Sequence, residues 1–169
     1  MKKYIDEQKI KNRVKDLGAS ITKNYNDKSK LTILCVLKGS FIFVADLIRE
    51  IDLDLSIEFI EISSYDGTSR GELILNKGIN FDVQNKNILI VEDIVDSGNT
   101  INFLYEYLQK QKPKSIQIAT LFFKPKAYNF NMKIDWIGFN ISNEFIVGYG
   151  LDHNEIFRNK KSIYILEDE

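Results

Sequence analysis

The first regular pattern along the chain is a helical one. Apolar residues recur every three or four positions from Ile10 to Tyr25, with lysine, aspartate and asparagine between them. This spacing places the apolar side chains on one face of a helix and the polar ones on the other. The pattern predicts an amphipathic helix over residues 10–25, followed by a polar loop that reaches Lys30.

Short continuous apolar runs, rich in β-branched residues, predict buried strands further along the chain. Three shorter pieces have the same character. The predicted strands are Leu31–Leu37, residues 55–62, Ile88–Val91, Ile116–Phe123 and Trp136–Ile141, with short ones over Leu73–Leu75, Phe145–Tyr149 and Ser162–Leu166.

Helical spacing returns twice between the predicted strands. Apolar positions over Phe41–Ile48 predict a second helix, and Ser40 directly before it is a residue type that caps helix N-termini. A third helix is predicted over Ile101–Leu108, and Pro113 lies beyond its end, where proline commonly follows a finished helix.

One segment between predicted strands has neither the apolar run of a buried strand nor the spacing of a helix. Residues 63–72 are small and polar and include two glycines, which predicts a loop. Because such a loop buries little apolar surface, we expect Ser64–Gly71 to be mobile without ligand.

The alternation of strands and helices predicts the fold class. It is typical of an α/β domain with a mainly parallel, twisted sheet flanked by helices. The length of 169 residues predicts a single domain over residues 1–169. Its core would span about residues 28–141, and the N-terminal segment and about residues 142–169 would form a small hood subdomain.

Composition and charge exclude several function classes. With 23 basic and 24 acidic residues the net charge is −1, which disfavours an electrostatic grip on nucleic acid. No apolar run has the length of a membrane span, and the start of the chain lacks the apolar segment of a secretory signal. The single cysteine, Cys35, excludes an internal disulfide, and the single histidine, His153, excludes a multi-histidine zinc site. We therefore expect a cytoplasmic protein that acts on small molecules.

The strongest candidate for chemistry follows the predicted strand Ile88–Val91. That strand runs into Glu92 and Asp93, and Asp96 opens a turn of small polar residues ahead of the third helix. In an open parallel sheet, ligands bind beyond the carboxyl ends of the strands. Small residues at a helix N-terminus offer backbone N–H groups to an anion, while carboxylates suit sugar hydroxyls or a divalent cation. The combination predicts a phosphorylated sugar bound with Mg²⁺.

A purely structural explanation exists for parts of this segment. Asp93 and Asp96 could be no more than turn and helix-capping residues. The whole string from Ile88 to Thr100 is harder to explain that way, because it joins a buried strand, three carboxylates and a small-residue turn. It matches neither the P-loop nor the dinucleotide-binding glycine pattern.

The string closely resembles the phosphoribosyl-diphosphate-binding motif of the type I phosphoribosyltransferases. Within that group, the chain is similar to the hypoxanthine-guanine phosphoribosyltransferases. Five blocks in the expected order carry the resemblance: Leu37–Ser40, Ser63–Tyr65 with its loop, Ile88–Thr100, Leu121–Lys124 and Phe145–Glu155 continuing to Arg158. It covers nearly the whole chain and implies the type I phosphoribosyltransferase fold.

The resemblance implies roles around phosphoribosyl diphosphate. Glu92 and Asp93 match the acidic pair that binds the ribose hydroxyls, and Asp96 matches the general base near purine N7. Lys38 and Gly39 match the pyrophosphate loop, where a cis peptide is characteristic. The implied diphosphate-substrate residues are Lys38, Gly39, Glu92, Asp93, Asp96, Ser97, Gly98, Asn99, Thr100 and Arg158.

The same resemblance implies a purine site, a metal and a lid. Lys124 matches the lysine that donates to the purine 6-oxo group, and Phe145 the aromatic that stacks on the base. Ile146 and Asp152 match contacts around C2. The implied magnesium ligands are Glu92, Asp93 and Asp152, and the implied lid residues are Ser64 and Tyr65.

Three positions vary from the family pattern. Asn99 stands where some members carry a cation, His153 where tyrosine is common, and Glu144 where some members have lysine. None of the three matches a residue at the reacting atoms, but Glu144 bears on base selectivity.

The implied activity is purine salvage, with Mg²⁺ as cofactor and a homodimer or homotetramer as the assembly. The base would be hypoxanthine or guanine, whereas a xanthine-preferring enzyme and an adenine- or uracil-type transferase are alternatives. A nucleic-acid-binding regulator on the same fold and a non-enzymatic nucleotide-binding module come from other classes. The near-neutral charge argues against the regulator, and Asp96 argues against the module.

Overall fold

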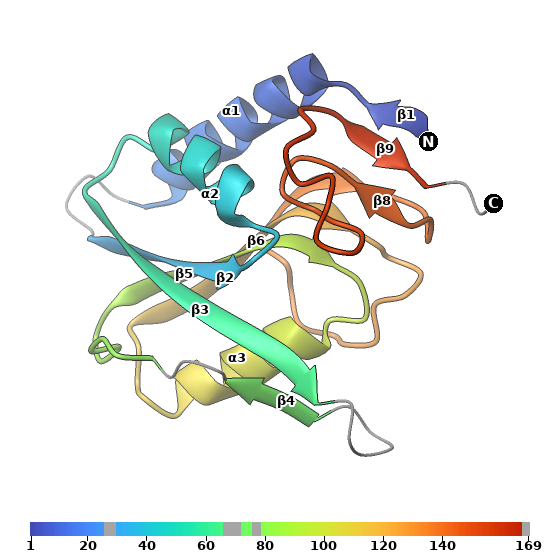
Figure 1. The fold of residues 1–169 in the computed structure, drawn as a ribbon. Helices are drawn as coiled ribbons and strands as arrows, with labels where there is room; N and C mark the ends of the chain where they lie inside the picture. The colour runs from blue at the N-terminus through green and yellow to red at the C-terminus, as the bar shows by residue number, and fades with distance from the viewer. Residues whose placement is uncertain (26–29, 66–71, 76–78, 167–169) are drawn as a thin grey trace.

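A six-stranded sheet lies at the centre of the protein (Figure 1), as seen in a computed structural model that describes residues 1–25, 30–65, 72–75 and 79–166. The strand order is β4-β3-β2-β5-β6-β7, and only the β3–β4 pair is antiparallel. This confirms the predicted α/β fold with a mainly parallel sheet. The strands are β2 (Leu31–Leu37), β3 (Leu55–Tyr65), β4 (Glu72–Leu75), β5 (Asn87–Val95), β6 (Ser115–Phe123) and β7 (Trp136–Asn140).

Helices cover both faces of this sheet. Figure 1 shows α1 and α2 on one side and α3 on the other. In β2, Ile33 and Cys35 pack in one hydrophobic cluster with α1 and α2, while Leu34 and Val36 pack in the other with α3. A strand buried on both faces has a continuous apolar sequence, which is the pattern seen in this run. The helices are α1 (Glu7–Asn24), α2 (Phe41–Leu47), the 3₁₀ turn η1 (Ile48–Glu50) and α3 (Asn99–Gln109).

A second, small antiparallel sheet brings the two ends of the chain together. Its order is β1-β9-β8, with β1 at Lys2–Ile5, β8 at Ile146–Val147 and β9 at Ile163–Ile165. β1 was not predicted from the sequence, because its lysines and an exposed tyrosine leave Ile5 as its one buried residue. α1 packs against the large sheet, whereas β1 joins the small one.

Strand β5 is longer than predicted, and its extension contains two candidate site residues. The expectation that the strand stops at Val91 is wrong, since β5 continues through Glu92 and Asp93 to Val95. The extension pairs with β6, where Glu92 lies opposite Thr120. Backbone pairing does not depend on side-chain polarity, so the apolar pattern ends before the strand does.

Two further expectations need correction. The predicted loop over residues 63–72 is shorter, because β3 continues to Tyr65 and β4 begins at Glu72; the rest of the predicted mobile loop lies outside the described residues. Ser40 stands at the N-cap position of α2 but does not cap it. Its hydroxyl donates to the Val36 carbonyl oxygen at 2.5 Å and lies 3.2 Å from the Cys35 sulfur, so it closes the turn after β2.

None of the helices in the described parts of the chain combines the length and the apolarity that crossing a bilayer takes.

Arg13 joins α1 to the outermost parallel strand and provides a test of this packing. Its Nε donates to the Gly138 oxygen and its Nη2 to the Ile137 oxygen, each at 2.7 Å. We expect Arg13→Ala to lower the free energy of unfolding by about 2–3 kcal/mol, because charge-assisted hydrogen bonds to partly buried carbonyls are lost. Urea denaturation measures this change. Lys15→Ala, at an exposed position of the same helix, is the matched control, and equal effects of the two substitutions would contradict the inference.

Candidate active site

Several of the predicted site residues follow three neighbouring strands at one edge of the large sheet. β2 leads into Lys38 and Gly39, β5 into the Asp96 turn, and β6 into Lys124. These strands are parallel neighbours, so their carboxyl ends lie side by side. The Lys124 amide donates to the Val95 carbonyl oxygen at 3.0 Å, which holds the ends of β5 and β6 together.

The loop after β2 passes directly over the acidic end of β5. The peptide bond between Leu37 and Lys38 is cis, as the resemblance implies for this loop. A Cβ atom added to Gly39 would lie 1.8 Å from Asp93 Oδ2, so a side chain here would collide with the carboxylate. The sequence block therefore needs glycine at position 39 for the loop to approach the strand.

The turn between β5 and α3 has the form of an anion cradle. Gly98, the N-cap of α3, has φ of +89°, and an added Cβ would lie 2.4 Å from a ring carbon of Tyr128. The helix begins at Asn99, two residues before the predicted Ile101. The amides of its first turn and the helix dipole favour a negative group. Tyr128 closes one side of this turn and has no signal in the sequence that assigns it there.

Lys124 and Asp96 form an ion pair at the centre of the candidate site. Lys124 Nζ lies 2.9 Å from Asp96 Oδ2. The lysine side chain is 10% exposed, whereas that of the aspartate is 53% exposed. The pair presents a hydrogen-bond donor and an acceptor side by side, and the structure thus brings together two residues that lie 28 positions apart.

The two carboxylates at the end of β5 lie in an environment that disfavours negative charge. Burial raises the pKa of Asp93 to about 6; the nearby Asp152 charge adds to this rise, while backbone hydrogen bonds and Arg158 oppose it. Burial and the Asp93 charge raise the pKa of Glu92 well above its ordinary value. Both residues lie within β5, so the expectation that they follow the strand instead of packing in it is wrong, most clearly for the buried Glu92.

The C-terminal block, residues 145–158, folds back onto the loop after β2. Gly150 has φ of +103°, and an added Cβ would lie 2.1 Å from the Gly39 carbonyl oxygen. Arg158 is anchored beside it, donating from Nη1 to the Gly150 oxygen at 2.9 Å and pairing through Nη2 with Asp152 Oδ1 at 2.8 Å. Lys38 and Glu155 approach to 3.6 Å across the gap between the two segments. Two chain segments more than a hundred residues apart thus meet beside the Asp93 carboxylate.

Phe145, Ile146 and Asp152, which were predicted for purine binding together with Lys124, lie in the same block. Phe145 is 53% exposed and packs edge-on against the His153 ring, with 5.4 Å between centroids. Ile146 is buried in β8. The exposed ring is free to stack on a planar ligand. Exposure alone does not assign this role to a phenylalanine. The side chains of the predicted lid residues, Ser64 and Tyr65, are outside the described part of the structure.

The carboxylates suit magnesium only when a ligand completes the coordination. Asp93 and Asp152 interact electrostatically and offer oxygen atoms, the donors that Mg²⁺ prefers. Within the described ranges, no group of three or more His, Cys, Asp or Glu side chains is placed to hold a metal ion, so Glu92, Asp93 and Asp152 do not form a closed cage. Magnesium commonly binds through one or two carboxylates plus substrate phosphates, and this donor set fits that mode.

The contacts between the C-terminal block and the segment after β2 were not predicted from the sequence. Gly150 and Tyr149 belong to the C-terminal block, but their packing against the β2–α2 segment was not anticipated. Two glycines flanking a tyrosine were the available signal, since paired glycines often mark a close backbone approach.

Comparison with known proteins identifies the family. Residues 1–154 match the phosphoribosyl transferase domain. The chain is 43% identical to the hypoxanthine-guanine phosphoribosyltransferase of Bacillus subtilis, covering 98% of this chain and 93% of that protein. It is also 43% identical to the hypoxanthine phosphoribosyltransferase of Buchnera aphidicola, over 94% of this chain and 91% of the relative. A solved hypoxanthine-guanine phosphoribosyltransferase from Bacillus anthracis superposes with a TM-score of 0.94, at 38% identity and 99% coverage of both chains. The chain belongs to the phosphoribosyltransferase family, among the hypoxanthine-guanine phosphoribosyltransferases.

Proposed function

We propose that this protein transfers the phosphoribosyl group of 5-phosphoribosyl 1-diphosphate to N9 of hypoxanthine or guanine. The products are the purine nucleotide and pyrophosphate. The Lys124–Asp96 pair is the observation that carries this proposal. O6 and N7 are neighbouring polar atoms on one edge of a 6-oxopurine. A donor and an acceptor 2.9 Å apart can meet the 6-oxo group and a protonated N7 at the same time.

This pair also accounts for selectivity against adenine. The Lys124 side chain is 10% exposed, and its ammonium group has N–H donors beyond the one that Asp96 accepts, so a base in the site is favoured if it supplies a further acceptor. Adenine presents an amino donor at that position and leaves the ammonium group without a new partner. Phe145 would stack on the base, with Ile146 and Asp152 near C2, and Glu144 precedes the stacking ring.

Asp96 acts as general base in the proposed reaction. It accepts the N7 proton and thereby makes N9 more nucleophilic as N9 bonds to C1′ of the sugar. The bond from C1′ to the pyrophosphate oxygen breaks at the same time, and positive charge develops on the ribose. Because the nucleophile is the base itself, the reaction needs no covalent intermediate with the protein.

The loops around Asp93 hold the diphosphate substrate. Lys38, the backbone at Gly39 and Arg158 stabilise the charge that develops on the leaving pyrophosphate. Glu92 and Asp93 bind the ribose hydroxyls, and Ser97 to Thr100 hold the 5′-phosphate. Asp93 and Asp152 would hold a magnesium ion, which would supply positive charge to the pyrophosphate as it leaves. A lid over Ser64 and Tyr65, a homodimer or homotetramer and a cytoplasmic location stay predictions of the sequence.

A steady-state panel of five bases tests the activity. Hypoxanthine, guanine, xanthine, adenine and uracil are each supplied with phosphoribosyl diphosphate and Mg²⁺. We expect turnover with hypoxanthine or guanine and none with adenine or uracil. Turnover of xanthine alone would replace the proposed substrate, and no turnover with any base would overturn the activity. RNA filter binding under the same conditions tests the regulator alternative.

Asp96→Asn separates the catalytic role from a turn-forming one. Asparagine keeps the shape and ranks with aspartate as a capping residue, but it has no basic carboxylate. General-base loss typically lowers the rate by ~10²–10⁴, so we expect turnover to fall at least ~10²-fold. The melting temperature should change little, because the asparagine oxygen can still accept a hydrogen bond from Lys124 and the side chain at position 96 is 53% exposed. Pre-steady-state turnover measured beside a thermal melt checks this. A chemical step within about threefold of wild type would remove Asp96 from the reaction.

Lys124→Met tests recognition of the 6-oxo group. The substitution removes a charge-assisted hydrogen bond in a closed site, so we expect kcat/KM for hypoxanthine and guanine to fall about 10- to 150-fold. Lys126→Met is the matched control, because Lys126 is exposed two positions further along the chain. Equal kinetics of the two variants would make Lys124 a residue without a role in base binding.

The raised pKa of Asp93 predicts a stability that depends on pH. The folded protein binds this proton with a pKa of about 6 and the unfolded chain with one near 3.8. The folded state therefore holds the proton more tightly, and stability falls as pH rises from 4 through 6. Asp93→Asn should match the wild-type melting temperature at pH 4 and exceed it at pH 7.5, while its affinity for phosphoribosyl diphosphate with Mg²⁺ falls.

Thermal melts across this pH range and calorimetry with the diphosphate substrate measure both effects. Asp16→Asn, on the exposed face of α1, is the control and should leave both curves unchanged. A variant that is less stable than wild type at pH 7.5, or that binds the substrate equally well, would contradict the proposed environment of Asp93.

A further inference from the structure

A hydrogen bond outside the reacting centre links the C-terminal block to α2. Tyr149 OH donates to Asp46 Oδ2 at 2.5 Å. Tyr149 is buried and has φ of +50°, in the left-handed region, and Asp46 lies on α2, the helix that follows the Lys38–Gly39 loop. The contact joins side chains that are 103 positions apart in the sequence.

The turn that carries Tyr149 holds the residues proposed for the diphosphate group. The Gly150 amide donates to the Arg158 carbonyl oxygen at 3.0 Å, and the Arg158 guanidinium returns a bond to the Gly150 oxygen. Gly150 also lies against the Gly39 carbonyl. Any movement of this turn therefore changes both the position of Arg158 and its fit against Gly39.

The base-stacking side of the block has a separate support. Ile146 and Val147 pair with Ile165 and Tyr164 of β9, which in turn pairs with β1. This ladder does not involve Tyr149 or Asp46. A loosened turn should thus disturb the diphosphate side of the site more than the purine side.

We propose that Tyr149 and Asp46 are a positioning pair, which holds the Gly148–Leu151 turn against the pyrophosphate loop and thereby sets the affinity for the diphosphate group. The inference rests on the proposed function of the site. Neither residue touches the reacting atoms. Tyr149 remains protonated and keeps donating, because burial and the Asp46 carboxylate raise its pKa.

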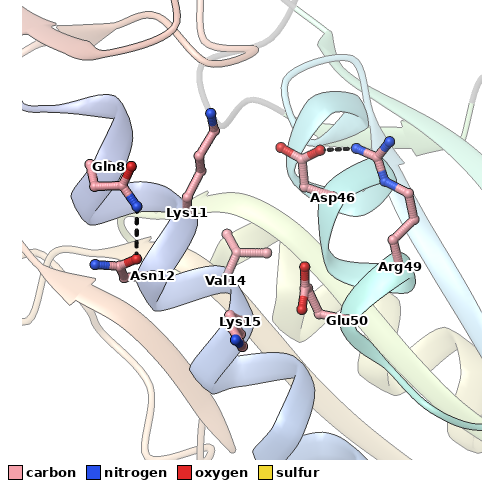
Figure 2. A pocket seen from close by; sticks show the side chains of 8 residues that line it. All are labelled: Gln8, Lys11, Asn12, Val14, Lys15, Asp46, Arg49 and Glu50. Atoms are coloured by element: carbon pink, nitrogen blue, oxygen red, sulfur yellow. Dashed lines mark hydrogen bonds and ion pairs between the residues drawn. The ribbon is translucent and has the colours of Figure 1, made fainter.

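The surroundings of Asp46 provide a matched control. Figure 2 shows Asp46 on the wall of a groove between α1 and the α2–η1 segment, where its other carboxylate oxygen pairs with Arg49. The Arg49 side chain is 71% exposed, so this ion pair should add little to the stability of the helix. Arg49→Ala removes the surface ion pair and leaves the bond between Asp46 and Tyr149.

The test compares three variants in full-length protein. Tyr149→Phe deletes only the hydroxyl, Asp46→Asn keeps an acceptor without the charge, and Arg49→Ala is the control. Calorimetry with pyrophosphate and Mg²⁺ measures the dissociation constant without turnover, and steady-state kinetics measure KM for phosphoribosyl diphosphate and for hypoxanthine. We expect Tyr149→Phe to weaken pyrophosphate binding at least about fivefold, because the binding-competent turn becomes less populated. KM for hypoxanthine should stay within about twofold, Asp46→Asn should be intermediate and Arg49→Ala should match wild type.

The outcomes separate this inference from the proposed function. If wild-type protein binds neither pyrophosphate nor phosphoribosyl diphosphate, the proposed function fails. If wild type binds both and Tyr149→Phe binds them equally well, the positioning role is wrong. An equal loss of purine and diphosphate affinity that follows a lowered melting temperature would also overturn it, since that is the signature of general destabilisation. Should Tyr149→Phe not fold, Asp46→Asn decides by the same criteria.

Discussion

Two carboxylates at the end of a central strand impose the constraint on which the site depends. β5 is buried on both faces and carries Glu92 and Asp93 beyond the apolar part of its sequence. Charges in such a place are disfavoured, and their pKa values are raised accordingly. Residues that stabilise the ligand-free fold best would be apolar here. The carboxylates are instead suited to a ligand that brings hydroxyl groups and a cation with it.

The segments around Asp93 approach one another closely, and glycines make the approach possible. The loop after β2 passes over the carboxylate with a glycine, and a second glycine lets the C-terminal block settle on that loop. Arg158 is held by Gly150 and Asp152, so its guanidinium is oriented before any substrate arrives. Interactions fixed in advance contribute more to a transition state than groups that must be ordered during the reaction.

Under the proposed function, the site divides into a diphosphate half and a purine half that join different parts of the fold. The turn of the diphosphate half contacts α2 through Tyr149, whereas the residues of the purine half join the small antiparallel sheet and the end of β6. Lys124 and Asp96 stand between the halves, on the ends of neighbouring parallel strands. Their ion pair keeps a buried ammonium group satisfied without ligand and offers both partners to the edge of an incoming purine.

Much of this arrangement could be predicted from local sequence. The apolar runs identified the parallel strands because strands buried on both faces need apolar side chains throughout, and the string from Ile88 to Thr100 identified the phosphate turn because its residue types are rare in combination. The family resemblance added roles to residues whose own patterns, as with Phe145, are those of ordinary packing. β1 and the true end of β5 were missed, since backbone pairing holds both and polar side chains conceal them.

Only the tertiary structure decided how the separate blocks meet. Nothing local to Gly39 indicates that Asp93 lies beneath it, and nothing local to Tyr149 indicates Asp46, because these contacts join segments from about 50 to more than 100 positions apart. The same holds for the environment of the carboxylates: Glu92 and Asp93 are ordinary acids in the sequence, and burial at the centre of a packed sheet changes their proton affinity. Residue order determined the strands, the turns and the candidate chemistry, whereas packing over long distances determined which groups lie together and how strongly each holds its charge.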